Sequence, residues 1–309
     1  MSGLAAGYVA DLLLGDPRRL HPVAGFGQMA SRAEAAVYAP TRARGLAYTA
    51  LLVAGAGAAG ELAARAGPGR PVVLAVATWT ALGGSGLVRT AARLADHLEA
   101  GDLDGARRAL PALCGRDPHA LDAAGLSRAA LESVAENTSD AVVGALLWGA
   151  VAGPGGVLAY RAANTLDAMV GHRTERYAEF GWAAARLDDA LNWPAARLSA
   201  ALTVLCAPLV GGSPARTWTM IRRDGGAHPS PNAGRVEAAF AGALGVRLGG
   251  PLAYAGLAEL RPTLGDGAAP SAADVRRAGR LSRAVGAAAA FACITGRALT
   301  TRLRTGRGA

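Results

Sequence analysis

The densest group of polar side chains lies in residues 132–140. Glu132, Glu136 and Asp140 are spaced four residues apart, so an α-helix would place their three carboxylates on one face. Like charges at this spacing repel, and something cationic must offset them. A solvated acidic face is the ordinary explanation, but the uncharged residues 141–160 follow directly. Because ionisable groups at the edge of a membrane segment are candidates for function, we interpret this cluster as functional.

Three short segments pair a carboxylate with an amide at a spacing of three residues, which places both on one face of a helix. The pairs are Asn137 with Asp140, Asn164 with Asp167, and Asp189 with Asn192, and Asp188 lies beside the third pair. Carboxylate and amide oxygens, without His or Cys, suit Mg²⁺. The predicted metal ligands are Glu136, Asp140, Asp167 and Asp188. The predicted catalytic set is Glu132, Glu136, Asn137, Asp140, Asn164, Asp167, Asp188, Asp189 and Asn192.

Arginines near these segments would bind carboxylate or phosphate groups of a substrate through paired hydrogen bonds, or would anchor the chain at a membrane interface. Two proline-containing loops, 11–22 and 228–234, add further polar groups. A capping role is the alternative for His21. The predicted substrate-binding residues are Asp16, Arg18, His21, Arg161, Arg173, Arg186, Arg197, Ser230 and Asn232.

The composition favours a membrane environment. Only 18% of the 309 residues are charged, against about 25% in soluble proteins, and the mean hydropathy is +0.23. All 32 basic residues are arginine, which excludes a Schiff-base lysine and a lysine-containing P-loop. The net charge of +9 does not indicate nucleic acid, because the arginines are scattered and aromatic residues make up only 5% of the chain.

Uncharged runs predict helices that cross the bilayer, since a span needs about 20 apolar residues. The runs 71–88 and 198–215 are long enough, and 141–160 qualifies if its Gly-Pro break is tolerated. The shorter runs 46–60 and 284–296 predict either spans or buried helices of a soluble bundle. We therefore predict an all-α, polytopic helical membrane protein with helical loops on the cytoplasmic side, forming a single integral membrane domain over residues 1–309. Arginines in the flanks place 16–44 and 89–140 in the cytoplasm and 61–70 outside.

The Gly-Pro-Gly-Gly sequence at 153–156 predicts a turn between two helices, 127–152 and 157–170. Asp140 and Asp167 lie at similar distances from this turn. A helical hairpin would therefore bring both aspartates to the same side of the membrane, where they could face each other.

At these residues the chain resembles the CobD/CbiB family, the adenosylcobinamide-phosphate synthases of cobalamin biosynthesis. Four blocks carry the resemblance: 11–22, 132–140, 160–197 and 230–250. The block 160–197 is the most specific, with Asn-Thr-Leu-Asp at 164–167 and Asp-Asp-Ala-Leu-Asn-Trp-Pro-Ala-Ala-Arg at 188–197. The chain departs from the family pattern after residue 234, where Arg-Val stands in place of Trp-Pro.

The resemblance implies a multi-pass enzyme of the cytoplasmic membrane that forms an amide. It would join adenosylcobyric acid to aminopropanol or its O-phosphate, with Mg²⁺ and with ATP as co-substrate, to give adenosylcobinamide or its phosphate. ATP would convert the carboxylate to an acyl phosphate, which the amine attacks. The predicted acids would hold Mg²⁺ and nucleotide or deprotonate the amine; none is singled out as the base, and no segment identifies the ATP site. The implied partners are the corrinoid, the amine and the lipid bilayer, with other pathway enzymes as candidates at the membrane.

Two other classes share some of these features. A Mg²⁺-dependent membrane prenyltransferase would use an aspartate pair such as Asp188 and Asp189, but a second aspartate-rich repeat is absent from the sequence. An ion-coupled transporter would use Glu136, Asp140 and Asp167, with 153–156 as a gating hinge. Long cytoplasmic loops and clustered amides favour the enzyme.

Overall fold

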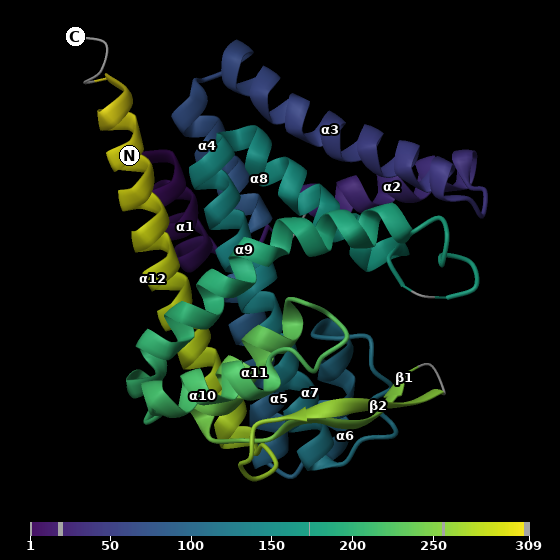
Figure 1. Ribbon diagram of the computed structural model, residues 1–309, viewed down its shortest axis with the longest axis vertical. Helices are drawn as coiled ribbons and strands as arrows, with labels where there is room; N and C mark the ends of the chain where they lie inside the picture. The colour runs from purple at the N-terminus through teal and green to yellow at the C-terminus, as the bar shows by residue number, and fades with distance from the viewer. Residues whose placement is uncertain (1, 18–20, 173, 255–256, 306–309) are drawn as a thin grey trace. The chain divides into compact units, whose positions relative to one another are not determined.

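The computed structural model describes residues 2–17, 21–172, 174–254 and 257–305 (Figure 1). Its regular structure is almost entirely helical, which confirms the predicted fold class. The chain packs as two compact units: unit 1 contains Met1–Gly83, Asp140–Pro194 and Ala289–Ala309, and unit 2 contains Gly84–Ser139 and Ala195–Ala288. The single integral membrane domain stays a prediction.

Unit 1 is built from helices alone within its described residues. They are α1 (Ser2–Leu14), α2 (Pro22–Val37), α3 (Arg42–Ala66), α4 (Arg70–Ala81), the π-helical turn η2 (Ser139–Val143), α8 (Gly144–Val170), the first part of α9 (Trp182–Cys206) and the last part of α12 (Ala272–Thr305). α8 contacts α2, α3 and α4, and α1 packs along α4 (Figure 1). α8 therefore contacts each of the four N-terminal helices of unit 1.

A cluster of buried side chains fixes the packing of α2, α3 and α8 in unit 1. Phe180 and Tyr48 are both buried, with ring centroids 5.1 Å apart, and Leu166 of α8 packs with them. Gly45 lies against the backbone of Phe180, where a Cβ atom would collide with the carbonyl group. A glycine is required at this close approach, because any side chain would push α3 away from the cluster.

The helical hairpin predicted around 153–156 is present within α8. Gly153 has φ +69° and ψ −150°, so the helix breaks there and the chain reverses. Gly149 before the break lies beside Val157 after it. Glu61 of α3 accepts a hydrogen bond of 3.2 Å from Gly155 N and forms an ion pair of 2.6 Å with Arg70. The turn is thus held by a carboxylate of the neighbouring helix.

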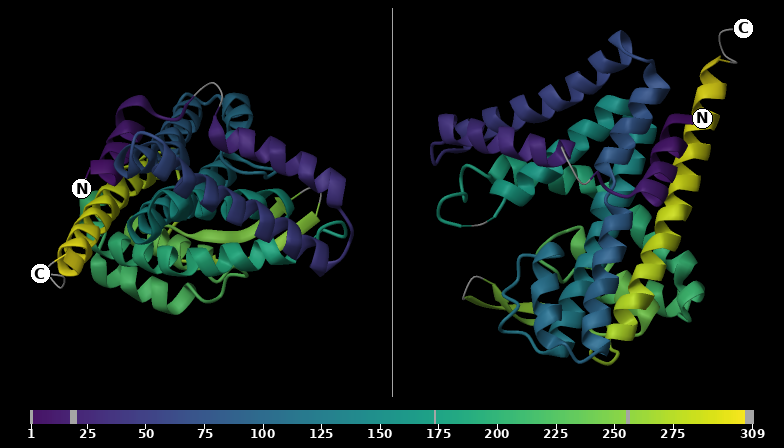
Figure 2. Two further views of the ribbon diagram at one scale, coloured as in Figure 1. Left: turned by 90° about the horizontal axis from the view of Figure 1, so that it is seen from above. Right: turned by 180° about the vertical axis from the view of Figure 1, so that it is seen from behind.

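Unit 2 combines short helices with the two strands of the described chain. It contains α5 (Gly84–Glu99), α6 (Leu103–Ala109), η1 (Leu110–Ala112), α7 (Ala123–Thr138), η3 (Ala207–Val210), α10 (Pro214–Asp224), α11 (Ala233–Leu244), β1 (Leu248–Tyr254) and β2 (Leu257–Leu264), with the adjoining parts of α9 and α12. α5, α6 and α7 lie side by side (Figure 2). β1 and β2 are antiparallel, with Leu248 opposite Leu264 and Gly250 opposite Arg261. The sequence analysis did not predict this hairpin.

Capping residues determine where several helices begin. Thr41 accepts from the backbone of Arg44 at the start of α3, and Asp122 accepts a hydrogen bond of 2.7 Å from Gly125 N at the start of α7. Asp102 has the same role at α6. A side-chain oxygen at this position satisfies a backbone N–H that the helix itself leaves unpaired.

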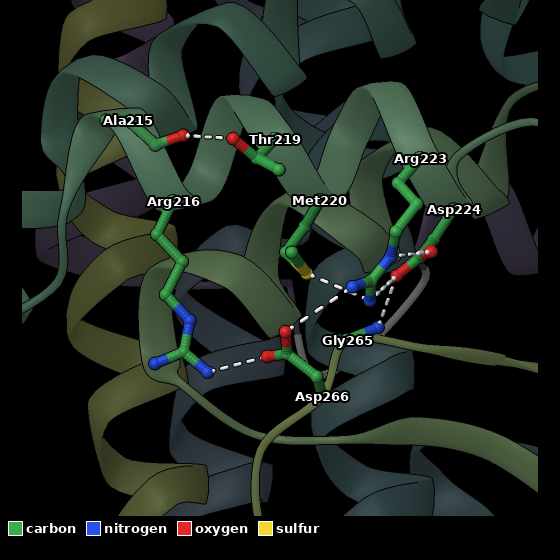
Figure 3. Close-up of polar contacts among 8 residues, drawn as sticks. All are labelled: Ala215, Arg216, Thr219, Met220, Arg223, Asp224, Gly265 and Asp266. Atoms are coloured by element: carbon green, nitrogen blue, oxygen red, sulfur yellow. Dashed lines mark hydrogen bonds and ion pairs between the residues drawn. The ribbon is translucent and has the colours of Figure 1, made fainter.

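Ionic contacts fasten the chain after β2 to α10 (Figure 3). Asp224 accepts hydrogen bonds from Arg223 Nε (2.6 Å) and from Gly265 N (2.7 Å). Asp266 accepts one of 2.8 Å from Arg216. The hydrogen bond from Arg223 holds the pKa of the buried Asp224 carboxyl below its ordinary value. This network fixes how β2 leaves the sheet.

Four helical segments are long and apolar enough to cross a membrane: Arg42–Ala66, Arg70–Glu99, Ala123–Val170 and Trp182–Val210. They coincide with the predicted runs 46–60, 71–88, 141–160 and most of 198–215. The fifth run, 284–296, is helical within α12 but is not among the candidate spans of the described chain. Large apolar side chains on these segments are exposed, including Leu51 (74%) and Val151 (68%), as lipid contact requires. The predicted orientation stays a prediction.

Candidate functional site

Polar side chains of unit 1 gather around Arg161, and we call them the Arg161 cluster. Its members are Asp16, Asp140, Tyr160, Arg161, Asn164, Asp188 and Asn192. The Arg161 guanidinium interacts electrostatically with the carboxylates of Asp16, Asp140 and Asp188. The cluster therefore combines one guanidinium with three carboxylates, and a cation would offset the surplus negative charge.

Hydrogen bonds join α8 to α9 within this cluster. Arg161 Nη1 donates to Asn164 Oδ1 (3.1 Å), and Asn164 Nδ2 donates to Asp188 Oδ1 (3.3 Å). Arg161 and Asn164 are one helical turn apart, so their side chains lie on the same face of α8. Asp188 is thereby held in place by an amide from a different helix, although the sequence analysis had paired Asn164 with Asp167.

Tyr160 links three segments at the centre of the cluster. Its side chain is 1% exposed, and its hydroxyl oxygen lies 2.6 Å from Asn192 Oδ1 and 2.8 Å from the carbonyl oxygen of Asp140. Gly144 lies against the tyrosine ring, where a Cβ atom would overlap the hydroxyl group. Asp140 itself lies in the π-helical turn η2, a distortion that is frequent at functional sites.

Several buried polar atoms of the Arg161 cluster have no hydrogen-bond partner among the described residues. They are Asp16 Oδ1, Arg161 Nε and Asn192 Nδ2. Buried polar atoms are normally paired, so these atoms are available to a ligand or to water. They include both acceptors and donors, which suits a ligand that carries phosphate oxygens together with a metal ion.

The donor chemistry of the Arg161 cluster fits Mg²⁺ rather than a metal that requires His or Cys. Within the described part of the chain, no three His, Cys, Asp or Glu side chains lie close enough to hold a metal ion by themselves. Mg²⁺ is commonly bound by one or two carboxylates, with waters and substrate phosphates completing its coordination. Asp140 and Asp188, the two members of the cluster that were predicted as metal ligands, could serve in this way.

A second group of charged residues lies in unit 2, and we call it the Glu132 cluster: Arg116, Glu132, Glu136, Glu237 and Arg261. Glu132 forms a buried ion pair with Arg116 and also accepts a hydrogen bond of 2.7 Å from Gly249 N. Glu237 is 2% exposed. Burial, followed by the charges of Glu132 and Glu136, raises the pKa of its carboxyl well above the ordinary value.

The sequence analysis missed Tyr160, Arg116, Glu237 and Arg261. Glu237 had a visible signal, because it is the one acid of α11 and stands among Ala, Gly, Val and Phe. The other three carried no local signal, since their importance comes from contacts made across the fold.

The predicted catalytic residues divide between the units. Asp140, Asn164, Asp167, Asp188, Asp189 and Asn192 belong to unit 1, whereas Glu132, Glu136 and Asn137 belong to unit 2. Asp167 lies beside Gly171 at the end of α8. Asn137 donates a hydrogen bond of 2.9 Å to Ser133 O in its own helix. Among the predicted metal ligands, Glu136 is the one that lies in unit 2.

The predicted substrate-binding residues have varied surroundings. Arg197 Nη1 donates to Asn232 Oδ1 (2.7 Å), and the Ser230 hydroxyl accepts from the backbone of Asn232 (3.3 Å), so these three residues form one group in unit 2. His21 caps α2 by accepting a hydrogen bond from Val23 N, the alternative role considered for it. Arg186 is exposed on α9. Arg18 and Arg173 lie outside the described residues.

Long apolar helices and these clusters of carboxylates, amides and guanidiniums define a polytopic helical membrane protein with oxygen-rich polar sites. Residues 4–282 match the family described as CobD/Cbib protein, and the chain belongs to this family. The family match spans both units.

Curated relatives cover nearly the whole chain. A protein of Mycobacterium tuberculosis named cobalamin biosynthesis protein CobD is 55% identical over 295 residues, which is 94% of each chain. Proteins of the same name from Chromobacterium violaceum and Pelobacter propionicus are 45% and 42% identical, covering 88% and 85% of this chain and 88% and 84% of their own. No solved structure matches the chain.

Proposed function

We propose that this protein acts in cobalamin biosynthesis as an adenosylcobinamide-phosphate synthase of the cytoplasmic membrane. It would join a carboxylate of adenosylcobyric acid to the amine of aminopropanol or its O-phosphate, with ATP and Mg²⁺. Membership of the CobD/CbiB family and the names of the curated relatives support the pathway. The Arg161 cluster is the single observation that supports the chemistry.

Amide formation needs an activated carboxylate, because an amine does not displace hydroxide from a carboxylate at neutral pH. In the proposed reaction a carboxylate oxygen attacks the γ-phosphorus of ATP, ADP leaves, and an acyl phosphate forms. The amine nitrogen then attacks the acyl carbon, phosphate leaves, and the nitrogen loses a proton. Both steps involve anionic oxygens, so the site must supply positive charge and hydrogen-bond donors.

The Arg161 cluster contains groups of the required kinds. Arg161 would pair with phosphate oxygens, and Asn192 Nδ2, which is buried without a partner, would donate to a substrate oxygen. Asp140 and Asp188 would hold Mg²⁺, which when bound neutralises the negative charge of the phosphates. One of the predicted acids would accept the proton released by the amine, and none of them is singled out as the base.

The proposal is tested on membranes that contain the full-length protein, supplied with adenosylcobyric acid, ATP, Mg²⁺ and either amine donor. Mass spectrometry detects the amide. We expect product with the wild type, a loss of about 100-fold or more in rate for Asp188→Asn, and a rate within twofold of wild type for Glu175→Gln, an exposed matched control. Folded wild-type protein that forms no amide with either donor would refute the synthase and favour the prenyltransferase or transporter.

The proposed partners follow from the same reaction. They are the corrinoid, the amine donor and the lipid bilayer, without nucleic acid; other enzymes of the pathway are candidates for docking at the membrane. Cell fractionation tests the location: we expect the protein in the cytoplasmic membrane fraction, resistant to extraction by salt. Recovery in the soluble fraction would contradict this part of the proposal.

A further inference from the structure

The Glu132 cluster in unit 2 contains more carboxyl groups than guanidinium groups. It has three carboxyl groups, Glu132, Glu136 and Glu237, and two guanidinium groups, Arg116 and Arg261. Glu132 is fully engaged, because one oxygen pairs with Arg116 and the other accepts from Gly249 N. Glu136 and Glu237 are therefore the two carboxyl groups of the cluster that could bind a ligand.

Glu237 is buried without the partners that a buried carboxyl group normally has. It is 2% exposed, and among the described residues its carboxyl group makes no hydrogen bond or ion pair. Its electrostatic neighbours are Glu132 and Glu136 on α7, Arg261 on β2, and Arg116. Glu136 lies one helical turn after Glu132 and is exposed to solvent. Glu136 therefore gives the cluster a carboxyl group that is open to solvent.

The cluster also holds an unused donor. Arg116 is 9% exposed, and its ion pair with Glu132 uses Nη2, whereas Nη1 has no hydrogen-bond partner among the described residues. Because Glu132 fixes the guanidinium, Nη1 is held in position without having to be ordered by a ligand. The cluster therefore offers two carboxyl acceptors and one preorganised donor.

These groups select a particular kind of ligand. A bare divalent metal ion would leave the Arg116 donor without an acceptor. An ammonium group has three N–H donors and one positive charge, which matches two carboxyl acceptors. The Arg116 donor requires an oxygen acceptor in the same molecule.

We propose that the Glu132 cluster binds an amino alcohol or its phosphate ester, with the ammonium group between Glu136 and Glu237 and an oxygen atom on Arg116. This inference rests on the proposed function, which requires such an amine as a substrate, and it assigns the binding of that amine to unit 2. Glu237 and Arg116 are then substrate-binding residues that the sequence analysis did not predict.

The test uses the full-length protein in lipid nanodiscs, without ATP or corrinoid. Isothermal titration measures binding of aminopropanol, of aminopropanol phosphate, and of propyl phosphate, which lacks the amine. We expect the amines to bind, and propyl phosphate to bind at least tenfold more weakly. We expect Glu237→Gln and Glu136→Gln each to weaken amine binding at least tenfold, while the control Glu175→Gln binds as the wild type does.

Folding does not obscure the test, because glutamine has nearly the same shape as the buried glutamate side chain at 237, and Glu136 is exposed. Amine binding within twofold of wild type in both variants would overturn the inference, as would equal binding of propyl phosphate. If amide forms in the wild type and the KM for the amine is unchanged in both variants, this inference fails and the synthase stands. Amine binding that depends on both glutamates, without any amide product, would support the site and refute the synthase.

Discussion

Removing the hydroxyl group of Tyr160 is the most specific way to perturb the Arg161 cluster. Tyr160→Phe keeps the buried ring and removes only the oxygen that lies 2.6 Å from Asn192 Oδ1 and 2.8 Å from the Asp140 carbonyl. The substitution leaves both acceptors without this donor and releases the contact between η2, α8 and α9. Asp140 and Asn192 can then shift relative to Arg161.

The expected magnitude follows from the number of hydrogen bonds lost. The hydroxyl group has one proton, so one full hydrogen bond disappears. In membrane proteins such a bond contributes about 0.6 kcal/mol on average and about 1.7 kcal/mol at most. If this free energy is lost from the transition state through misplacement of Asp140 and Asn192, kcat falls by about 3- to 20-fold.

The assay is amide formation, with kcat and KM measured separately for the corrinoid, ATP and the amine. We expect a lower kcat, together with a higher Mg²⁺ concentration for half-maximal rate, because Asp140 would hold the ion. Tyr48→Phe is a matched control, since Tyr48 is also buried but donates to Ala30 O, away from the cluster. Unchanged kcat and Mg²⁺ dependence in Tyr160→Phe, or equal losses in the control, would refute a positioning role for Tyr160.

Three further predictions concern stability, measured as thermal unfolding in detergent. Gly153→Ala should lose about 1–3 kcal/mol, because its backbone angles are strained for any residue with a Cβ atom; no change would contradict the hairpin turn. At neutral pH, Glu237→Gln should unfold at a higher temperature than the wild type, and near pH 4 the two should unfold at the same temperature. The raised pKa of the Glu237 carboxyl group destabilises the wild-type fold as pH rises above the unfolded pKa of about 4.3. A constant difference from pH 4 to 8 would contradict burial of an ionisable carboxyl group. Asp224→Asn should lose about 1–3 kcal/mol of stability at pH 7 and little at pH 3. The lowered pKa of the Asp224 carboxyl group stabilises the fold above the unfolded pKa of about 3.9, and this stabilisation is lost as pH falls through the pKa of the folded state. A loss as large at pH 3 as at pH 7 would point to packing instead.

Local patterns in the sequence determined much of the fold. Four of the five apolar runs lie in segments that are long enough to cross a membrane, because the bilayer imposes a length and a composition on any helix that spans it. The turn at 153–156 was equally predictable, since few residues other than glycine adopt the backbone angles of Gly153. The strands β1 and β2 were not predicted, because Gly and Pro interrupt the alternation that marks a strand.

For the candidate site, the sequence identified residue types and left their partners open. Asp140, Asn164, Asp188 and Asn192 were predicted from short-range spacing, which is a property of single helices. Only the tertiary structure paired Asn164 with Asp188 and brought Tyr160 to Asn192. It also divided the acidic cluster, because Asp140 belongs to unit 1 and Glu136 belongs to unit 2. Helical periodicity specifies which side chains share a face, whereas the packing of distant segments decides which charges meet and which buried groups remain for a ligand.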